Sequence, residues 1–315
     1  MTSGSRDGAV GVRSGHFCPL AVDGDQPAGR IMALAIEAQM PEIRFYSVAS
    51  DAHRRRRATQ LHNYRVALRR TKSLIVAGQR VFPPFLADSA IRAVSSELRA
   101  TAGVRNLDVL AESLKSWADG LSPELHVGLR AIVDVTEERR RLGYEAVAAM
   151  IASDAHREMI ADLRTLGTVY RLGGEEAGED VLIRSKVVAT SAFDDAWARV
   201  EEASEIAMAS GEISDWHRLR RRLRRVRNLT DAFGPVIGDD LSTQRAKQVG
   251  KLLRELGELQ DMVVEAELLE KFGRKLGAEA AMAAGAMINP IQLEIPQQVR
   301  RVRKRWKKLH RLTIT

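Results

Sequence analysis

The sequence predicts an all-α protein, because two observations agree on helical structure. Apolar residues recur at three- and four-residue spacing along the chain, and no sustained alternation of apolar and polar residues signals a strand. A segment of 56 residues, Thr59–Leu114, also recurs without a gap 155 residues later as Ser214–Leu269. Two copies are too few for a solenoid. We therefore expect two antiparallel helical bundles of about four helices each, related by an internal pseudo-two-fold axis.

The chain is expected to begin with a disordered tail over residues 1–34. Gly, Ser and Asp are frequent up to Gly29, and the first residues lack the apolar core of a secretory signal. One domain should follow over residues 35–315. Its first half is expected to span 35–165 and its second half 180–315.

Proline and glycine place the helix ends. A helix over Leu61–Arg80 should end before Pro83-Pro84, and another should start after Ser122-Pro123. In the second half, a helix should end at Gly234-Pro235, and the last helix should begin at about Pro296. The apolar residues of that last helix are spaced to be buried. They are Val299, Val302, Trp306 and Leu309.

Composition indicates a globular protein without a membrane span. The chain is 45% hydrophobic and 29% charged, and no apolar stretch approaches the roughly 20 residues that cross a bilayer. Cys18 is the single cysteine, which excludes a disulfide framework and a multi-thiolate metal site. A lone cysteine fits a reducing compartment, so we expect a cytoplasmic protein.

The net charge of +8 is distributed unevenly along the chain. Three strips, residues 53–72, 216–227 and 297–311, hold 23 of the 49 cations and none of the 41 acids. The rest of the chain is therefore acidic. Solvated helix faces usually intersperse Glu with Lys as i,i+4 partners, and these strips do not. The distribution predicts dedicated binding of an anionic partner.

The internal repeat selects the candidate binding residues, because cations recur at the same positions in both copies. In the first copy they are His62, Arg65, Arg69, Arg70 and Lys72, with Arg92 and Arg99 on the next helix. In the second copy they are His217, Arg220, Arg224, Arg225 and Arg227, with Lys247 and Arg254 on the next helix.

Helical geometry arranges the first-copy cations as a stripe beside the buried face. At 100° per residue, Arg65, Arg69 and Lys72 fall next to the apolar stripe instead of opposite to it. The stripe spans roughly 15 Å at ~1.5 Å per residue, which suits several consecutive phosphates. Arginine prevails over lysine, and its planar guanidinium forms forked hydrogen bonds to phosphate oxygens. The stripe predicts an elongated phosphate-bearing ligand.

Catalytic motifs are not found in the sequence. It contains no GxxxxGK[ST] loop, HExxH, paired-cysteine zinc spacing or GxSxG elbow. The acid pairs Asp194-Asp195 and Asp239-Asp240 diverge by 100° on a helix, which disfavours joint coordination of Mg²⁺. We therefore expect a protein that is not an enzyme, with no catalytic residue, metal ligand or cofactor.

Two motif blocks resemble the CHAD family, whose name refers to histidines in an α-helical domain. The first block is Leu61–Ser73 with Arg105–Leu110, and the second is His217–Arg227 with Leu256–Asp261. The resemblance spans roughly residues 36–312. It implies two helical bundles related by pseudo-two-fold symmetry, a basic surface that binds inorganic polyphosphate, and association with polyphosphate granules.

The resemblance also implies which residues bind the ligand, and it has two departures. The implied residues are His62, Arg65, Arg69, Arg70 and Lys72, together with His217, Arg220, Arg224, Arg225 and Arg227. The family often has Arg-Asp where this chain has Arg105-Asn106, and commonly has Leu at the position of Thr71.

Two alternative functions remain open at this stage. The basic strips and a pI of about 9.9 permit binding of nucleic acid such as RNA, although only 5% aromatic residues offer few platforms for stacking bases. A metal-dependent phosphohydrolase is the other alternative. Competition with RNA and release of orthophosphate separate these functions from polyphosphate binding.

Overall fold

The computed structural model describes residues 24–48, 57–168, 182–237 and 240–314, and it confirms the all-α class. Within these ranges the chain forms α-helices and one short 3-10 helix, η2, and no strand. The elements are α1 (Ala28–Glu37), α2 (Met40–Val48), α3 (Arg57–Ala77), α4 (Pro84–Ala100), α5 (Ala102–Ala118), η2 (Pro123–Leu125), α6 (His126–Ala152), α7 (Asp154–Thr168), α8 (Ser185–Ser210), α9 (Ile213–Ile237), α10 (Asp240–Leu276) and α11 (Ala278–Ile314).

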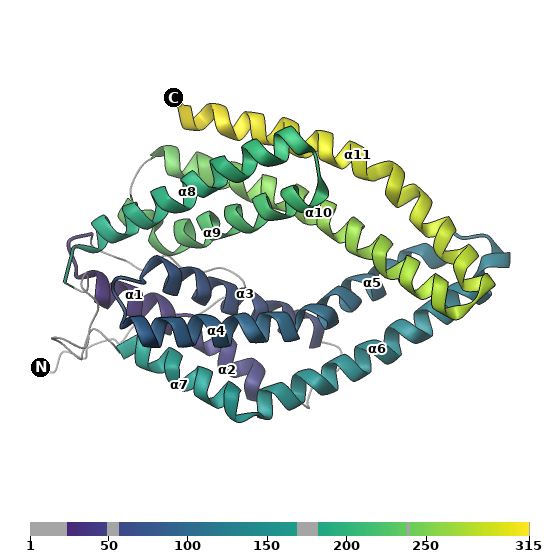
Figure 1. The fold of residues 1–315 in the computed structure, drawn as a ribbon, viewed down its shortest axis with the longest axis horizontal. Helices are drawn as coiled ribbons and strands as arrows, with labels where there is room; N and C mark the ends of the chain where they lie inside the picture. The colour runs from purple at the N-terminus through teal and green to yellow at the C-terminus, as the bar shows by residue number, and fades with distance from the viewer. Residues whose placement is uncertain (1–23, 49–56, 169–181, 238–239, 315) are drawn as a thin grey trace, which may run out of the picture.

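The helices form two groups that meet along α3 and α9 (Figure 1). One group consists of α1 to α7 and the other of α8 to α11. The main apolar core draws buried side chains from both groups, for example Leu68 of α3 and Leu223 of α9. A second core joins α5, α6, α10 and α11 where these long helices converge, away from α1 and α8. The α3–α9 contact is therefore the place where cations of both repeat copies approach each other.

The expected number of about four helices per half holds for the second group and is wrong for the first. Within the described ranges, α1 to α7 precede residue 169 and α8 to α11 follow residue 181. The repeat explains part of the difference, because α4 and α5 correspond to the single helix α10. The break falls at Thr101, where the Leu98 carbonyl accepts a hydrogen bond from the Arg65 guanidinium. The pseudo-two-fold axis stays a prediction.

The prediction of a disordered tail over residues 1–34 is contradicted at its C-terminal end. Helix α1 begins at Ala28, and its Ile31, Met32 and Ile36 side chains are buried in the main core. A short helix in a Gly-rich context lacks the length that makes helical periodicity visible, which is why this prediction was wrong for residues 28–34. Residues 1–23, which include Cys18, lie outside the described residues.

Proline predicted some helix ends and missed others. Helix α3 ends at Ala77, before Pro83-Pro84, as expected, and η2 and α6 follow Ser122. The ends predicted at Pro235 and Pro296 are wrong, because α9 continues to its end at Ile237 and α11 runs through Pro290 and Pro296. Both prolines of α11 lie on its exposed side. A proline has no N–H to donate within the helix, but the carbonyl groups left without a partner on this side can bind water. The packing of α11 against α10 therefore outweighs the cost of the two prolines.

The apolar face predicted for the last helix is found in α11. Val302, Trp306 and Leu309 are buried, and Val299 packs against the core while half-buried. This face turns the neighbouring cations of the third basic strip, such as Arg300 and Lys304, towards solvent. None of the helices in the described ranges is both long enough and apolar enough to cross a bilayer.

Candidate anion-binding cleft

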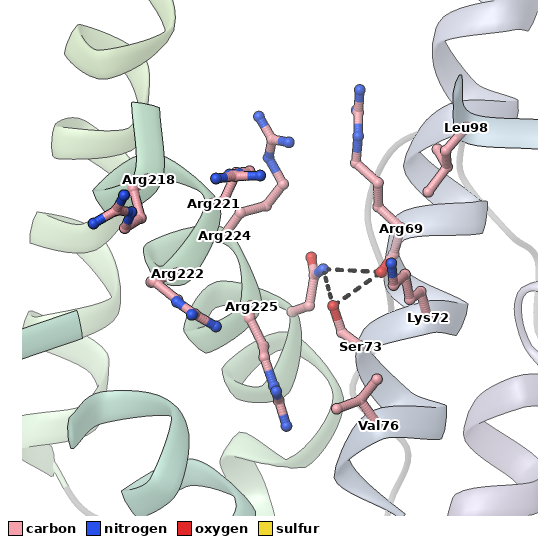
Figure 2. Close-up of a pocket in the computed structure, with 11 residues that line it drawn as sticks. Arg69, Lys72, Ser73, Val76, Leu98, Arg218, Arg221, Arg222, Arg224 and Arg225 are labelled. Carbon is pink, nitrogen blue, oxygen red and sulfur yellow. Dashed lines mark hydrogen bonds between the residues drawn. The ribbon is translucent and has the colours of Figure 1, made fainter. Parts of the chain in front are cut away.

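A cleft of about 460 Å³ lies between α3 and α9 (Figure 2). Its lining combines cations of both basic helices, and none of the described residues that line it is acidic. On the side of α3 and α4 it is lined by Arg69, Lys72, Ser73, Val76 and Leu98. On the side of α9 it is lined by Arg218, Arg221, Arg222, Arg224, Arg225 and Asn228.

The α3 side of the cleft is positioned by the buried stripe of that helix. Leu68 and Ile75 are fully buried, and Arg69 and Lys72 follow beside them at the edge of the core. The Lys72 ammonium donates a hydrogen bond to the Ser95 hydroxyl of α4 at 2.7 Å. This arrangement is the one that helical geometry predicts for a stripe bordering a buried face.

The α9 side holds more cations than the α3 side. Leu219, Leu223 and Val226 are buried, and the arginines fill most positions between and around them. In Figure 2, Arg224 of α9 and Arg69 of α3 extend in the same direction. These two residues are repeat equivalents, so the structure brings together two cations that the repeat singled out.

Arg69 and Arg224 are held in an unfavourable electrostatic environment. Burial, followed by the charges of Arg224 and Arg65, lowers the pKa of Arg69 to about 9. Burial, followed by Arg220 and Arg65, lowers the pKa of Arg224 to about 10. Both residues remain charged at neutral pH, and their charged forms are destabilised. An anion bound between them would offset the repulsion and compensate for the solvation that the two guanidinium groups have lost.

The two predicted histidines lie beside this cation cluster. Partial burial, and then the charges of Arg105, Arg69 and neighbouring arginines, lower the pKa of His62. Burial is also the main cause of the lowered pKa of His217, whose Nδ1 forms a hydrogen bond with the Gln260 side chain. Both rings therefore favour the neutral form, in which a ring N–H can donate to an anion.

Arg65 and Arg220 lie beside the cluster and outside the cleft lining. Arg65 is buried and donates hydrogen bonds to the Leu98 carbonyl at 2.7 Å and to the Thr101 hydroxyl. Arg220 lies against the backbone of α10, where a Cβ added at Gly257 would come within 3.3 Å of Arg220 Nη2. Each arginine thus rests on the helix that follows its own in the repeat.

One acid, Asp261 of α10, faces the cluster. The charges of Arg220, Arg105 and Arg224 favour its ionised form, but burial dominates and raises the pKa of Asp261. Its repeat equivalent in the first copy is Asn106, which carries no charge. The cluster is therefore only partly neutralised by the protein itself.

Several predicted site residues lie away from the cleft lining. Arg70 and Arg227 both pair with Asp231, at 3.9 Å and 2.8 Å, and Arg227 also donates to the Ala246 carbonyl at 3.1 Å. The Arg70–Asp231 pair ties α3 to α9, whereas the Arg227–Asp231 pair lies within α9, and both pairs leave less charge for a ligand. Four others are exposed on α4 and α10 outside the lining, and their binding role stays a prediction. They are Arg92, Arg99, Lys247 and Arg254.

Sequence reasoning missed four cations at or beside the cleft. Arg218, Arg221 and Arg222 line it, but the first copy has Asn63, Val66 and Ala67 at their positions, so a search for recurring cations passed over them. The acid-free second strip was the signal that contained them. The fourth is Arg105 of α5, whose charge lowers the pKa of His62, Arg65 and Arg69.

Comparison with known proteins identifies similar sequences and folds. The family model of the CHAD domain matches residues 47–270. Two curated relatives, the uncharacterized proteins MT2285 and Rv2226 of Mycobacterium tuberculosis, are each 28% identical over 264 residues, which cover 78% of this chain and 46% of the relative. The chain therefore spans about half the length of these curated relatives.

Two solved structures share the fold. The CHAD domain from the plant Ricinus communis superposes with a TM-score of 0.72 at 18% identity, covering 95% of this chain and 97% of that chain. PptA from Streptomyces chartreusis superposes with a TM-score of 0.64 at 15% identity, covering 89% of this chain and 99% of that chain. At such low identity the likeness concerns the fold.

Proposed function

The chain belongs to the CHAD domain family, and from this premise we propose that it binds inorganic polyphosphate in the cleft between α3 and α9 without chemically changing it. The proposal rests on one observation above all. Arg69 and Arg224, half-buried and mutually repelling, meet in a cleft whose described lining contains cations and no acid. Such a cluster is stabilised most by a ligand that brings several negative charges at once.

The shape of the cleft favours a linear polyanion over a single phosphate. Cations line it from Arg69 to Lys72 along α3 and from Arg218 to Arg225 along α9. The α9 stretch alone rises about 10 Å, at ~1.5 Å per residue. A single phosphate ion would contact only a few of the cations along this length. A chain of phosphates places a charge beside each cation in turn.

Binding without turnover is supported by the polar groups of the cleft. Ser73 supplies the hydroxyl group among the described lining residues, and it is already engaged. It donates to the Arg69 carbonyl at 2.9 Å and accepts from the Asn228 amide at 2.8 Å. A hydroxyl held in this way is poorly placed to attack a phosphoanhydride.

Titration with long-chain polyphosphate at increasing salt tests the proposal. We expect micromolar or tighter binding that weakens steeply with salt, because each neutralised phosphate releases a counterion. Absence of binding at low salt would contradict the proposal. Release of orthophosphate from polyphosphate with Mg²⁺ or Mn²⁺ would assign a phosphohydrolase instead.

RNA is the second candidate ligand, and the exposed cations of α11 favour it. Arg300, Lys304 and Lys307 lie on the solvent side of that helix. Their spacing along one face can contact a nucleic-acid backbone without reading its sequence. Competition between polyphosphate and RNA for the protein distinguishes the two ligands. Displacement of polyphosphate by equimolar RNA phosphate would favour the second candidate.

In the cell, the proposed role is attachment of the protein to polyphosphate granules in the cytoplasm. A tagged copy should gather at granules in phosphate-rich cells. The Arg69→Gln, Arg224→Gln variant of the same tagged copy should remain dispersed. If the variant and the unaltered protein had the same distribution, granule association would not depend on the cleft.

A further inference from the structure

The second-copy half of the cleft carries cations that the first-copy half lacks. At the positions of Arg221 and Arg222, the first copy has the uncharged residues Val66 and Ala67. Arg225 and its repeat equivalent Arg70 also differ in their surroundings. Arg70 pairs with Asp231, whereas no carboxylate among the described residues lies within ion-pair distance of Arg225.

Arg225 belongs to a group of cations that extends from the cleft to α8. Burial, followed by the charges of Arg199 and Arg222, lowers the pKa of Arg225, and Asp195 opposes this effect. The Arg225 Nε is buried and lacks a hydrogen-bond partner among the described residues. Two like charges, those of Arg199 and Arg222, therefore lie near the half-buried Arg225 guanidinium, whose Nε is left without a partner. Such a group is stabilised by an anion.

The direction of these side chains separates the group from the Arg69–Arg224 cluster. In Figure 2, Arg222 and Arg225 extend to the opposite side from Arg69 and Arg224. Arg222 and Arg225 nevertheless line the same cleft. A ligand that contacts both groups must therefore be long enough to pass along α9. Arg199, exposed on α8 and outside the cleft lining, would meet that ligand where it leaves the cleft.

We propose that Arg199, Arg222 and Arg225 form a second phosphate-binding subsite, which a long polyphosphate chain reaches after crossing the cleft and a short chain does not. This inference rests on the proposed function and makes the site selective for chain length. It also makes the site asymmetric, because the first copy offers no equivalent subsite. Asp195, which lies near Arg225, limits the affinity of this subsite.

The variant Arg199→Gln tests the subsite without changing any residue of the cleft lining. Binding of long-chain polyphosphate and of tripolyphosphate is measured at several salt concentrations. Long-chain affinity should fall about five-fold and its salt slope by about one, because one phosphate contact is lost. Tripolyphosphate affinity should be unchanged. Lys186→Gln, which removes one exposed charge from the same helix, is the matched control and should change neither affinity.

The variant Asp195→Asn supplies a test in the opposite direction. It removes the negative charge that acts on Arg225, so it should raise long-chain affinity and leave tripolyphosphate affinity unchanged. Equal effects of Arg199→Gln and Lys186→Gln would overturn the subsite while the proposed function stands. An equal loss of tripolyphosphate affinity in Arg199→Gln would also overturn it. Failure of the unaltered protein to bind either ligand would instead refute the proposed function.

Discussion

The side-chain amide of Asn228 on α9 donates a hydrogen bond to the hydroxyl of Ser73 on α3, at 2.8 Å, and the two residues occupy the same position in the two repeat copies. The same amide reaches the Arg69 carbonyl at 3.4 Å. These contacts join the two walls of the cleft beside its cations. The approach of Arg69 to Arg224, also repeat equivalents, therefore depends partly on a neutral polar link between their helices.

Replacing Asn228 with Ala should weaken this link. We expect the free energy of unfolding to fall by about 1 kcal/mol, because a half-buried hydrogen bond is lost and Ser73 loses its donor. Polyphosphate affinity should fall as well, since the walls of the cleft lose a connection. Urea denaturation and ligand titration measure the two effects. Thr230→Ala, which removes a bond within α9 alone, is the control and should leave affinity unchanged.

Arg69 and Arg224 should bind the ligand at the expense of stability. The double change Arg69→Gln, Arg224→Gln removes two half-buried, mutually repelling charges, so we expect the unliganded protein to gain about 1–2 kcal/mol. Polyphosphate affinity should fall at least ten-fold. By contrast, Arg65→Gln should destabilise the protein, because Arg65 satisfies the Leu98 carbonyl. Thermal unfolding without ligand distinguishes the ligand-binding role of Arg69 and Arg224 from the structural role of Arg65. A lower stability of the double variant would contradict the repulsion between Arg69 and Arg224.

The pKa of about 9 for Arg69 predicts a pH dependence with opposite signs for binding and stability. Above pH 9 the folded protein releases this proton while the unfolded chain, with its normal arginine pKa, retains it. The unfolded state then binds more protons, so this residue makes unfolding less favourable as pH rises from about 9 towards 12. Polyphosphate affinity should decline over the same range, because a charge that contacts the ligand is lost.

This dependence is checked by measuring polyphosphate affinity at constant ionic strength from about pH 7.5 to about pH 10.5, a range that brackets the pKa of Arg69. The Arg69→Gln, Arg224→Gln variant is the reference, since lysines also titrate near the upper limit. The decline should be steeper in the unaltered protein than in the variant. Parallel curves would show that other cations account for the pH dependence.

Sequence reasoning identified the fold class and selected the two arginines that meet in the cleft, for reasons that the structure makes clear. Helical periodicity persists wherever a helix has one buried face, as along α3 and α9. Recurrence selected Arg69 and Arg224 because both copies keep them. Recurrence could not distinguish Arg70 from Arg225, since the pairing of Arg70 depends on Asp231, which has no counterpart in the first copy. This ion pair depends on how α3 and α9 pack together, so the spacing of residues along the sequence cannot predict it.

Asp261 should compete with the ligand for the arginines around it. We expect Asp261→Asn, which introduces the residue type of its repeat equivalent Asn106, to raise polyphosphate affinity several-fold. Burial raises the pKa of Asp261, so its carboxylate takes up a proton at a higher pH than an ordinary aspartate. Affinity of the unaltered protein should therefore increase as pH falls through that titration, and the variant should lack the increase. Glu267→Gln, exposed further along α10, is the control.

Gly257 should matter for binding through the space that it leaves for Arg220. A Cβ at this position would lie 3.3 Å from Arg220 Nη2, so Gly257→Ala forces that guanidinium to shift by a few tenths of an ångström. Polyphosphate affinity should fall about two- to three-fold, because Arg220 helps to set the charge around Arg224. The free energy of unfolding should rise or stay unchanged, because alanine favours a helix interior by up to about 1 kcal/mol over glycine.

Gly285→Ala is the matched control for Gly257→Ala. Gly285 also lies inside a helix, α11, and a Cβ added there meets no atom within 4 Å among the described residues. It should therefore stabilise the protein by the same helix preference and leave polyphosphate affinity unchanged. If both variants are more stable and only Gly257→Ala loses affinity, the loss is due to the shift of Arg220. A general destabilisation of the fold would instead lower the free energy of unfolding. Equal affinities of both variants would show that the position of Arg220 does not influence the ligand.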